Sequence, residues 1–358
     1  MKLCSVLLLA GIATSVNAFC NSTLPSAVNA SACDSGTCGA ADVFGGKDVP
    51  IVWPRVSNNK VAIRYCFYDT DTDKRLRSLV RGAMDVWMGA LGERKKDNGH
   101  AIEFYEHTDK DNKPYHCVDE SNPSRPWNTN LQTDTVAILW RGADGINPQP
   151  VPASSATLGC LKKPNPFVLN LVVGTSHTLW EITHELGHVL GMVHEHQRAD
   201  RDLFIKYNCD KVFGFDAAWQ KASADGISKD RLCNDAQVAT YYGFWAGVQF
   251  IRGFIGVLKW EVVGSGAYDI ESIMHYASDA GVADQTRCNA NHPDEPAMCV
   301  MAFWKNPSKH DAGWETRFRQ NPISQRDVAW VKKVYPWDGT FSWSGQNQDL
   351  IQFGDVAK

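Results

Sequence analysis

The chain has 358 residues, of which 44% are hydrophobic, so it is long enough to bury a substantial core. Its formal net charge is −4 at pH 7, from 36 basic and 40 acidic residues. This balance argues against a nucleic-acid-binding protein and against one drawn strongly to an anionic membrane surface.

The first 18 residues have the pattern of a secretory signal peptide. Lys2 precedes an apolar run over residues 3–12, and Val16-Asn17-Ala18 supplies the small residues of a cleavage site. The apolar run is about half of the ~20 residues that a membrane span needs, so we expect no transmembrane segment. Residues 1–18 are therefore predicted to be removed, and the mature protein is expected to be secreted and extracellular.

The cysteine content agrees with export. Of the 11 cysteines, Cys4 would be lost with the signal peptide, and the remaining ten are compatible with five disulfides in an oxidising compartment. Short sequence separations predict two of these bonds, Cys209 with Cys233 and Cys288 with Cys299. The remaining connectivity does not follow from the sequence.

Residues 19–49 are interpreted as a short pro-segment. They are rich in Ser, Ala, Asn and Gly and lack apolar periodicity. Asn21-Ser22-Thr23 and Asn29-Ala30-Ser31 are glycosylation acceptors if the source is eukaryotic.

The pattern then predicts helices and strands in alternation. Six apolar residues at i, i+3 and i+4 spacing predict an amphipathic helix over residues 73–91. They are Leu76, Leu79, Val80, Ala83, Met84 and Trp87. Short apolar or β-branched runs at 101–105, 135–140 and 167–173 predict strands. A second helix is expected over about 178–190.

The end of that second helix carries an H-E-x-x-H-x-x-G-x-x-H motif. His184 and His188 lie one helical turn apart on the same face, so both can bind one ion. Gly191 allows the chain to turn back and bring His194 to the same metal. Three imidazoles leave one position of a tetrahedral Zn²⁺ open for water, and Glu185 is placed to take its proton. Incidental histidines on an amphipathic helix are the disfavoured alternative, because these residue types stand at these offsets.

A second motif, Ser272-Ile273-Met274-His275-Tyr276, lies further along the chain, and the first motif continues as H-E-x-x-R to Arg198. Together the two motifs resemble those of the astacin family of zinc endopeptidases, within the metzincin clan. Residues 51–65 resemble the start of an astacin catalytic domain, and residues 323–335 resemble its last helix.

The resemblance implies a role for each site residue. His184, His188 and His194 would bind one catalytic Zn²⁺, and Glu185 would be the general base. Tyr276 would be the switch tyrosine, which ligates zinc at rest and turns toward the developing oxyanion. His196 and His275 also lie near the site, but the family pattern has no ligand at either position.

Three further residues receive supporting roles from the same resemblance. Met274 would form the hydrophobic floor beneath the metal, and Glu195 would hold the new N-terminus of the mature enzyme. Phe44-Gly45-Gly46-Lys47-Asp48 is similar to the latency motif of astacin pro-segments, although Lys47 intervenes before the acid. Asp48 is therefore a possible latency ligand, with a solvated loop acid as the equal alternative.

The fold implied by the resemblance is α+β, a metzincin-like zinc protease of two subdomains. A twisted mixed sheet and the active-site helix would lie above the cleft, and an irregular lower subdomain with a C-terminal helix would lie below it. Residues 155–160 resemble the family's edge strand, along which an extended peptide can add. The catalytic domain would span residues 50–336, followed by a C-terminal tail over 337–358.

Two features depart from the family pattern. Cys117 with Cys160 resembles one of the two family disulfides, but the partners of the second are missing. Cys66 is left over, so we expect it to pair with an N-terminal cysteine and tether the pro-segment, or else to remain a free buried thiol. An insertion at about 203–266 contains the apolar stretch 240–263. We favour a packed element or cleft wall over a membrane or partner contact, because Arg252 interrupts it.

The sequence therefore predicts a secreted, zinc-dependent endopeptidase that hydrolyses peptide bonds in proteins through a metal-activated water. Its partners would be protein or peptide substrates, and it would be monomeric. The alternatives are a catalytically silent secreted binding or adhesion protein on the same fold, and a hydrolase of another substrate class. The intact Glu185 and Tyr276 argue against the first, and the edge strand argues against the second. Arg287 in the loop 285–303 is not assigned a specificity role.

Overall fold

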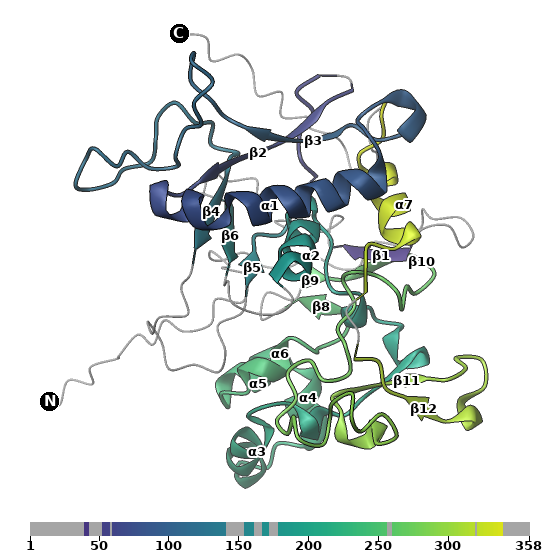
Figure 1. Cartoon of the computed structure of the whole chain (residues 1–358). Helices are drawn as coiled ribbons and strands as arrows, with labels where there is room; N and C mark the ends of the chain where they lie inside the picture. Colours follow the sequence, from purple (N-terminus) through teal and green to yellow (C-terminus); the bar gives the residue numbers. More distant parts are fainter. Residues whose placement is uncertain are drawn as a thin grey trace, which may run out of the picture.

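The computed structural model describes residues 39–42, 52–57, 59–140, 154–160, 167–171, 178–255, 260–318 and 321–338. Figure 1 shows an upper subdomain built on a sheet and a lower subdomain of short helices and strands. The predicted signal peptide, both glycosylation acceptors and Asp48 lie outside the described residues. Within them, none of the helices combines the length and apolarity that a membrane crossing requires.

The upper subdomain is organised around a five-stranded mixed sheet. The strand order is β3 (Ile102–Glu106), β2 (Val61–Phe67), β4 (Val136–Trp140), β6 (Phe167–Leu171) and β5 (Ser155–Ala156). Neighbouring strands are parallel except for β5, which runs antiparallel to β6. The sequence-based strands are confirmed to within a few residues, and β5 is the terminal strand of the sheet, as predicted for the edge strand.

Helices α1 (Thr70–Leu91) and α2 (Thr178–Leu190) pack against each other in the upper subdomain. The start of α1 is capped by Asp69, whose side chain accepts a hydrogen bond from the Thr72 backbone N–H. The apolar face of α1 predicted from its spacing is buried in the core. Trp87 on that face also donates a hydrogen bond from Nε1 to the carbonyl of Thr183, which ties the two helices together.

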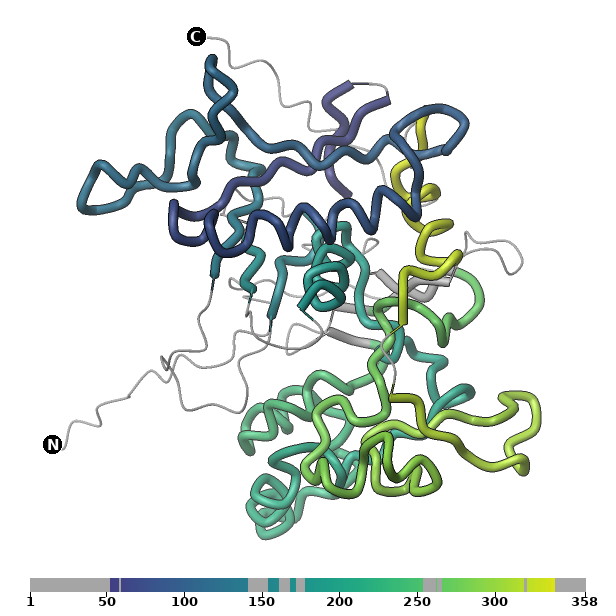
Figure 2. The backbone as a smooth tube through the Cα atoms, in the orientation of Figure 1, coloured from purple at the N-terminus to yellow at the C-terminus, as the bar shows by residue number. Residues whose placement is uncertain are grey.

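Helix α7 (Gln325–Val334) follows the lower subdomain in the chain, but its buried residues join the upper core. Ser324 caps it, and Asp327 completes a capping box with the Ser324 backbone N–H. Figure 2 shows the chain returning from the lower subdomain to this helix beside α1. Val328, Trp330 and Val331 form its buried face.

The lower subdomain has its own core and contains more regular structure than its sequence pattern predicted. Its helices are α3 (Phe215–Ala224), α4 (Lys229–Asn234), α5 (Ala236–Tyr241) and α6 (Trp245–Val248). Its three-stranded antiparallel sheet has the order β12 (Trp314–Glu315), β11 (Met301–Trp304) and β7 (Ile205–Tyr207). The predicted disulfides Cys209–Cys233 and Cys288–Cys299 are both present and lie in this core.

Shorter elements complete the described chain. Two strand pairs are β1 (Gly39–Asp42) with β10 (Val263–Gly266), and β8 (Phe254–Ile255) with β9 (Trp260–Glu261). Single 3-10 turns lie at Lys96–Asn98, Glu195–Gln197, Arg201–Leu203, Cys209–Lys211, Pro296–Met298 and His310–Ala312.

The apolar stretch 240–263 packs into the lower core over the part whose side chains are described. Phe244, Phe250 and Ile251 are at most 3% exposed and belong to one apolar cluster, although Tyr241 and Trp245 remain exposed. The favoured interpretation as a packed element is therefore confirmed up to Ile251.

The structure corrects the predicted pairing of Cys66 and Cys117, which are bonded to each other. The segment around Cys117 runs beside the end of β2, where the Cys117 N–H donates to the carbonyl of Phe67, and the two Cα atoms lie 5.3 Å apart. Cys160 is buried in a different apolar cluster. Three predictions are therefore wrong. Cys117 does not pair with Cys160, Cys66 does not tether the pro-segment, and Cys66 is not a free thiol.

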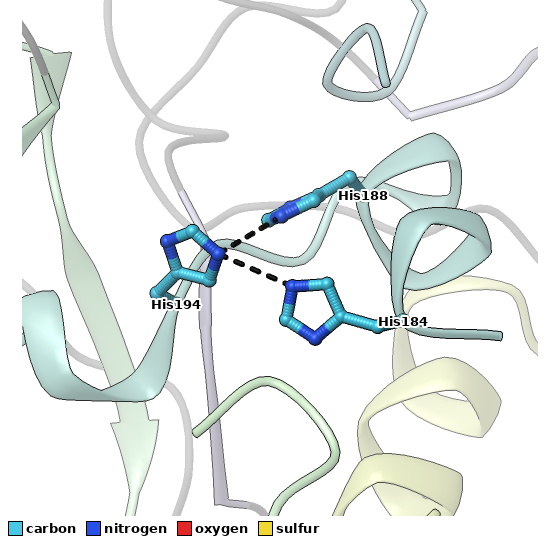
Figure 3. Close-up of side chains that lie close together, drawn as sticks. All are labelled: His184, His188 and His194. Atoms are coloured by element: carbon cyan, nitrogen blue, oxygen red, sulfur yellow. Dashed lines mark hydrogen bonds between the residues drawn. The ribbon is translucent and has the colours of Figure 1, made fainter. Parts of the chain in front are cut away.

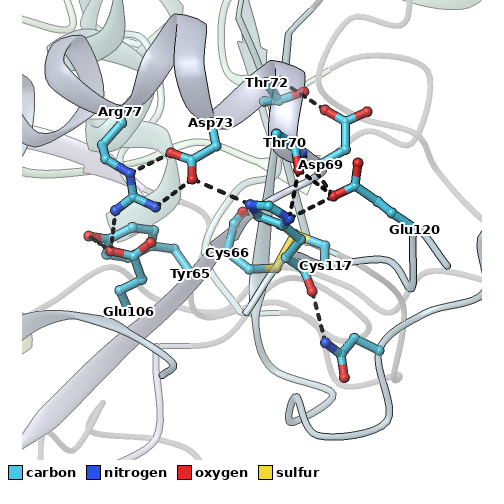
Figure 4. Close-up of polar contacts among 12 residues, drawn as sticks. Tyr65, Cys66, Asp69, Thr70, Thr72, Asp73, Arg77, Glu106, Cys117 and Glu120 are labelled. Atoms are coloured by element: carbon cyan, nitrogen blue, oxygen red, sulfur yellow. Dashed lines mark hydrogen bonds and ion pairs between the residues drawn. A yellow bond between two sulfur atoms is a disulfide. The ribbon is translucent and has the colours of Figure 1, made fainter. Parts of the chain in front are cut away.

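A group of polar side chains, which we call the α1 polar cluster, surrounds this disulfide at the start of α1 (Figure 4). Its members are Asp69, Thr70, Asp73, Arg77, Glu106, His116, Glu120 and Arg125. Asp73 forms an ion pair with Arg77, which in turn donates to Glu106 at 2.8 Å. Each charged member has an oppositely charged or hydrogen-bonding neighbour.

Candidate metal centre

Three predicted ligands meet where α2 ends. Figure 3 shows the imidazoles of His184 and His188 projecting from α2 toward that of His194, which follows the turn. The helix ends at Gly191, whose φ of 106° lies in the left-handed region that favours glycine. The turn is closed by the Met192 N–H, which donates to the carbonyl of Gly187.

The spacing of the ring nitrogens fits one metal ion. The Nε2 atom of His194 lies 3.2 Å from the Nε2 atoms of both His184 and His188. Zn–N bonds of about 2.0–2.1 Å in a tetrahedral site place ligand nitrogens about 3.3 Å apart. These three histidines form the metal-binding group of the described residues.

Backbone carbonyls select the tautomer of two ligands. Nδ1 of His184 donates to the carbonyl of Ile273 at 2.8 Å, and Nδ1 of His188 donates to the carbonyl of Met192 at 2.7 Å. Because a carbonyl can only accept, Nδ1 carries the proton and the Nε2 lone pair of each ring faces the other histidines. Lone pairs that converge in this way can bind a cation.

Burial keeps the ligands neutral. It lowers the pKa of His184 to about 3, with a contribution from His188, and it lowers the pKa of His188 to about 4. The pKa of His194 is also well below its usual value, first because of burial and then because of the neighbouring histidines. At neutral pH the site therefore offers neutral imidazoles, and no proton has to be displaced when a metal binds.

The S-I-M-H-Y segment lies directly against the zinc helix. Met274 is 1% exposed, and a Cβ added to Gly187 of α2 would lie 2.5 Å from its Sδ atom. The residue before it, Ile273, supplies the carbonyl that holds His184. Met274 is thus packed against the ligand-bearing helix, and its role as the floor beneath the metal stays a prediction.

Glu185 and Tyr276 reach the same centre from opposite subdomains. Glu185 is 8% exposed, and its Oε2 atom has no hydrogen-bond partner among the described residues. Burial, with the charge of Glu181, raises the pKa of Glu185 to about 8. The Tyr276 ring centroid lies 4.2 Å from that of His194 and 6.1 Å from that of His184. Burial also raises the pKa of Tyr276, so its phenol keeps its proton.

Residues 170–244 match the family model of astacin, a family of peptidases. This segment contains the whole zinc motif and the ligand cluster. The chain is a zinc metalloendopeptidase whose zinc-motif segment is similar to the astacin family. Its cofactor is zinc, for which the histidine cluster provides neutral nitrogen donors at suitable spacing.

Two solved structures of similar proteins match most of the chain. One is high choriolytic enzyme 1, a hatching-enzyme zinc protease from Oryzias latipes (medaka fish). It is 18% identical, with a TM-score of 0.44, over 85% of this chain and 96% of that chain. The other is myroilysin, which is 19% identical, with a TM-score of 0.39, over 83% of this chain and 98% of that chain. No protein with a curated description matches the chain significantly.

In this peptidase, Glu195 is fully buried and directly follows the third histidine in the chain. Its Oε1 atom accepts hydrogen bonds from the Asp269 N–H at 2.7 Å and from Arg198 at 3.2 Å. Its Oε2 atom is buried and has no partner among the described residues. Burial therefore raises the pKa of Glu195 well above its usual value, although Arg198 acts in the opposite direction.

The two other histidines near the zinc centre of the peptidase have different partners. Nε2 of His196 donates to the carbonyl of Gln249 at 3.0 Å. His275 donates from Nδ1 to the carbonyl of Tyr276, and its Nε2 atom accepts from the hydroxyl of Tyr268 at 2.7 Å. The group that could hold a metal ion among the described residues includes neither of them.

The structure also adds site residues that the sequence did not identify. Phe250 packs against both Tyr276 and His196, with ring centroids 6.0 Å and 5.4 Å apart. The carbonyls of Ile273 and Met192 orient zinc ligands. The only signal for Phe250 was its place in an apolar stretch, and backbone acceptors leave no signal in a sequence. Arg287, by contrast, is exposed and pairs with Glu295.

Proposed function

We propose that this zinc endopeptidase is secreted and cleaves proteins with Glu185 as the general base. When bound, zinc lowers the pKa of a water and polarises the scissile carbonyl. The positive charge of bound zinc would favour the ionised form of Glu185 against the effect of burial. The carboxylate would take the proton from that water and pass it to the leaving amine. The observation that carries this role is the buried Oε2 atom of Glu185, which has no hydrogen-bond partner among the described residues and stands beside the ligands.

Tyr276 would donate its phenolic proton in a hydrogen bond to the developing oxyanion. Its raised pKa supports a donor role, because only the protonated phenol can donate. Charge stabilisation of this kind is usually the largest contribution to catalysis. The roles of Glu185 and Tyr276 are therefore complementary, since one accepts a proton and the other donates a hydrogen bond.

The peptide substrate would bind along β5 as an added strand. β5 is the terminal strand of the upper sheet, with β6 on one side. The Gly159 N–H just beyond it donates to the carbonyl of His188 at 2.9 Å, so this edge is attached to the zinc helix. An extended peptide on β5 would thus pass close to the ligands.

The test is hydrolysis of casein or gelatin by the processed, secreted protein. We expect activity that a zinc chelator abolishes and added zinc restores. Glu185→Gln should lower kcat by about 10²–10⁴-fold while zinc content stays at one ion per chain. The matched control is Glu93→Gln, because that side chain is 87% exposed. Full activity in Glu185→Gln, or none in the zinc-loaded wild type, would contradict the proposal.

We also propose that Glu195 binds the N-terminal ammonium of the processed chain. The support is its buried Oε2 atom, which has no partner among the described residues, since a buried carboxylate oxygen needs a donor. Acetylation of the terminal amine should lower the Tm of the wild type and leave the Tm of Glu195→Gln unchanged. Equal shifts in both proteins would exclude this contact.

The processing steps form a separate proposal. Residues 1–18 would be removed on secretion, and residues 19–49 would be removed on activation to leave a monomeric catalytic domain over 50–336 with a tail over 337–358. N-terminal sequencing of the secreted precursor should start at Phe19. If Asp48 confers latency, Asp48→Ala should raise the activity of the precursor, and unchanged activity would exclude this role. Loss of mass on enzymatic deglycosylation would test Asn21 and Asn29.

A further inference from the structure

The carboxylate of Asp327 binds more than its own helix. Its Oδ2 atom accepts the Ser324 N–H of the capping box and also the backbone N–H of Ile273, both at 2.9 Å. Its Oδ1 atom accepts the hydroxyl of Ser272 at 2.7 Å. Two of these three hydrogen bonds therefore run from α7 to the loop that leads into Met274.

Helix capping alone does not account for this side chain. Asp327 is fully buried, and burying a carboxylate costs far more than a helix cap contributes. A buried carboxylate is stable where donors surround its oxygens, and here the loop supplies two of those donors. The start of α7 and the loop therefore form one buried polar unit.

Ile273 extends this unit to the zinc site. Its N–H donates to Asp327, and its carbonyl accepts the Nδ1 hydrogen of His184 at 2.8 Å. One residue thus links a carboxylate of α7 to the first zinc ligand. The hydrogen bond at Nδ1 fixes the tautomer and the ring orientation of a ligating histidine, so a displaced Ile273 would release the ring of His184.

A second connection joins the same region to the same ligand. The ring centroid of Trp180 lies 5.1 Å from that of His184, at an interplanar angle of 32°. Nε1 of Trp180 donates to the carbonyl of Asn321 at 2.6 Å. The side-chain amide of Asn321 in turn donates to two carbonyls of the loop, just before Ile273. The segment 321–327 is therefore linked to His184 by two routes.

His188 is held in a different way. Its Nδ1 atom donates to the carbonyl of Met192, four residues further along the chain. Displacement of the loop around Ile273 would leave this hydrogen bond in place. The two ligands of α2 can therefore be compared within one protein, with His188 as the internal control for His184.

We propose that Asp327 is a positioning residue for the zinc ligand His184 and acts through the backbone of Ile273. The inference goes beyond the proposed function, because it requires zinc binding but no catalytic role of Glu185 or Tyr276. Failure of the proposed function would appear in turnover, whereas failure of this inference would appear in the ring hydrogens and in zinc affinity.

The first experiment follows the two Nδ1 hydrogens by NMR in the zinc-loaded protein labelled with ¹⁵N-histidine. Both should exchange slowly with water, because both rings are buried and hydrogen-bonded. Asp327→Ala should speed exchange at His184 roughly tenfold and leave exchange at His188 within about twofold. Equal acceleration at both histidines would indicate a general opening of the site, and either that result or no acceleration would overturn the proposal.

The second experiment measures the zinc dissociation constant by competition with a chelator. Asp327→Ala should raise this constant about tenfold, as expected when the support of a metal ligand is lost. Asp327→Asn should recover most of the affinity, because its amide oxygen can still accept the Ile273 N–H. An Asp327→Asn variant that binds zinc as weakly as Asp327→Ala would overturn the proposal, because this hydrogen bond would then not position the ligand.

The matched control for stability is Val334→Ala. Val334 is buried in the same core, about 10 Å further along α7 from Asp327. Its truncation should lower the Tm and leave zinc affinity and both exchange rates unchanged. A loss of affinity equal to that of Asp327→Ala would overturn the proposal, because loss of stability alone would then explain the effect.

Ser272→Ala is a milder variant for the case in which Asp327→Ala does not fold. It removes one of the two hydrogen bonds between the loop and Asp327. Exchange at His184 should rise about threefold, with exchange at His188 unchanged. Unchanged exchange at His184 would overturn the proposal.

Discussion

The zinc centre and the α1 polar cluster both gather histidine and carboxylate side chains, but in opposite surroundings. In the α1 polar cluster, His116 lies 2.7 Å from Glu120 and 3.3 Å from Asp73, at the partly exposed end of α1. In the zinc centre, nearly inaccessible imidazoles direct lone pairs at one another, and the Oε2 atom of Glu185 has no partner among the described residues. Buried lone pairs that converge on one point indicate a site for a cation, whereas carboxylates and cations that pair with one another indicate structural support.

The largest difference between the two regions is expected when one histidine is removed from each. His188→Ala should lose stoichiometric zinc and essentially all peptidase activity, because two imidazoles remain for the ion. His116→Ala should keep zinc and activity within about twofold, because its partners are partly exposed carboxylates whose ion pairs contribute little. Metal analysis and casein hydrolysis measure both. Equal losses in the two variants would mean that the α1 polar cluster is also part of the active site.

The next largest difference is expected when one tyrosine hydroxyl is removed from each region. Tyr276→Phe should lower kcat by roughly 10²-fold with a small change in KM, as expected for an oxyanion donor. Tyr65, whose hydroxyl lies 3.5 Å from Glu106 beside the α1 polar cluster, provides the control. Tyr65→Phe should leave both constants unchanged. Steady-state kinetics on one peptide substrate would measure both variants. Equal changes in kcat for Tyr276→Phe and Tyr65→Phe would contradict the role of Tyr276.

A smaller effect is expected from alanine in place of a glycine on each helix. In Gly187→Ala the new Cβ would lie 2.5 Å from Met274 Sδ, so the S-I-M-H-Y segment must shift, at a cost of about 1–3 kcal/mol in the free energy of unfolding. Gly89→Ala on α1 meets no atom within 4 Å and should stabilise by about 0.5–1 kcal/mol. Urea denaturation should therefore give changes of opposite sign. If Gly187→Ala kept the wild-type free energy of unfolding and zinc affinity, the Met274 side chain would be able to move aside at little cost, against this prediction.

The smallest predicted effects are opposite pH dependences of stability for two carboxylates. Burial raises the pKa of Asp327 to about 6, against the effect of its hydrogen bonds from Ser272, Ser324 and Ile273. Its contribution is fully present below the ordinary value of 3.8 and is lost as pH rises through about 6. Asp327→Asn should therefore gain stability relative to the wild type as pH increases from about 4 to about 7.

Asp73 should behave in the reverse sense. Burial acts to raise its pKa, but hydrogen bonds from Arg77 and His116 outweigh burial and hold the pKa below 3.8. Its contribution is therefore present above that value and is lost as pH falls through the lowered pKa. Asp73→Asn should lose stability relative to the wild type at neutral pH and approach it in acid. Thermal melts across this pH range would refute the assignment if the two variants changed in the same direction.

Much of the upper subdomain and the zinc ligands could be predicted from the sequence because their signals are local. The apolar face of α1 follows from a 3.6-residue period, and His184 and His188 share a face through their spacing on α2. The ends of α2 agree with the predicted range, and the strands are close to theirs. Glu185, Met274 and Tyr276 were located through family motifs, and the structure places Tyr276 beside His194 and Met274 against the ligand-bearing helix.

The tertiary structure decided the contacts between segments distant in the chain. The bond from Cys66 to Cys117 depends on a loop returning beside β2, and the packing of Phe250 on Tyr276 depends on how the insertion folds against the zinc-binding loop. Neither contact has a periodicity or a spacing that marks it beforehand. The sequence by itself therefore determined the chemistry of the zinc motif, because one helical turn sets the distance between its first two ligands. The surroundings that orient those residues arise only when remote segments exclude water together.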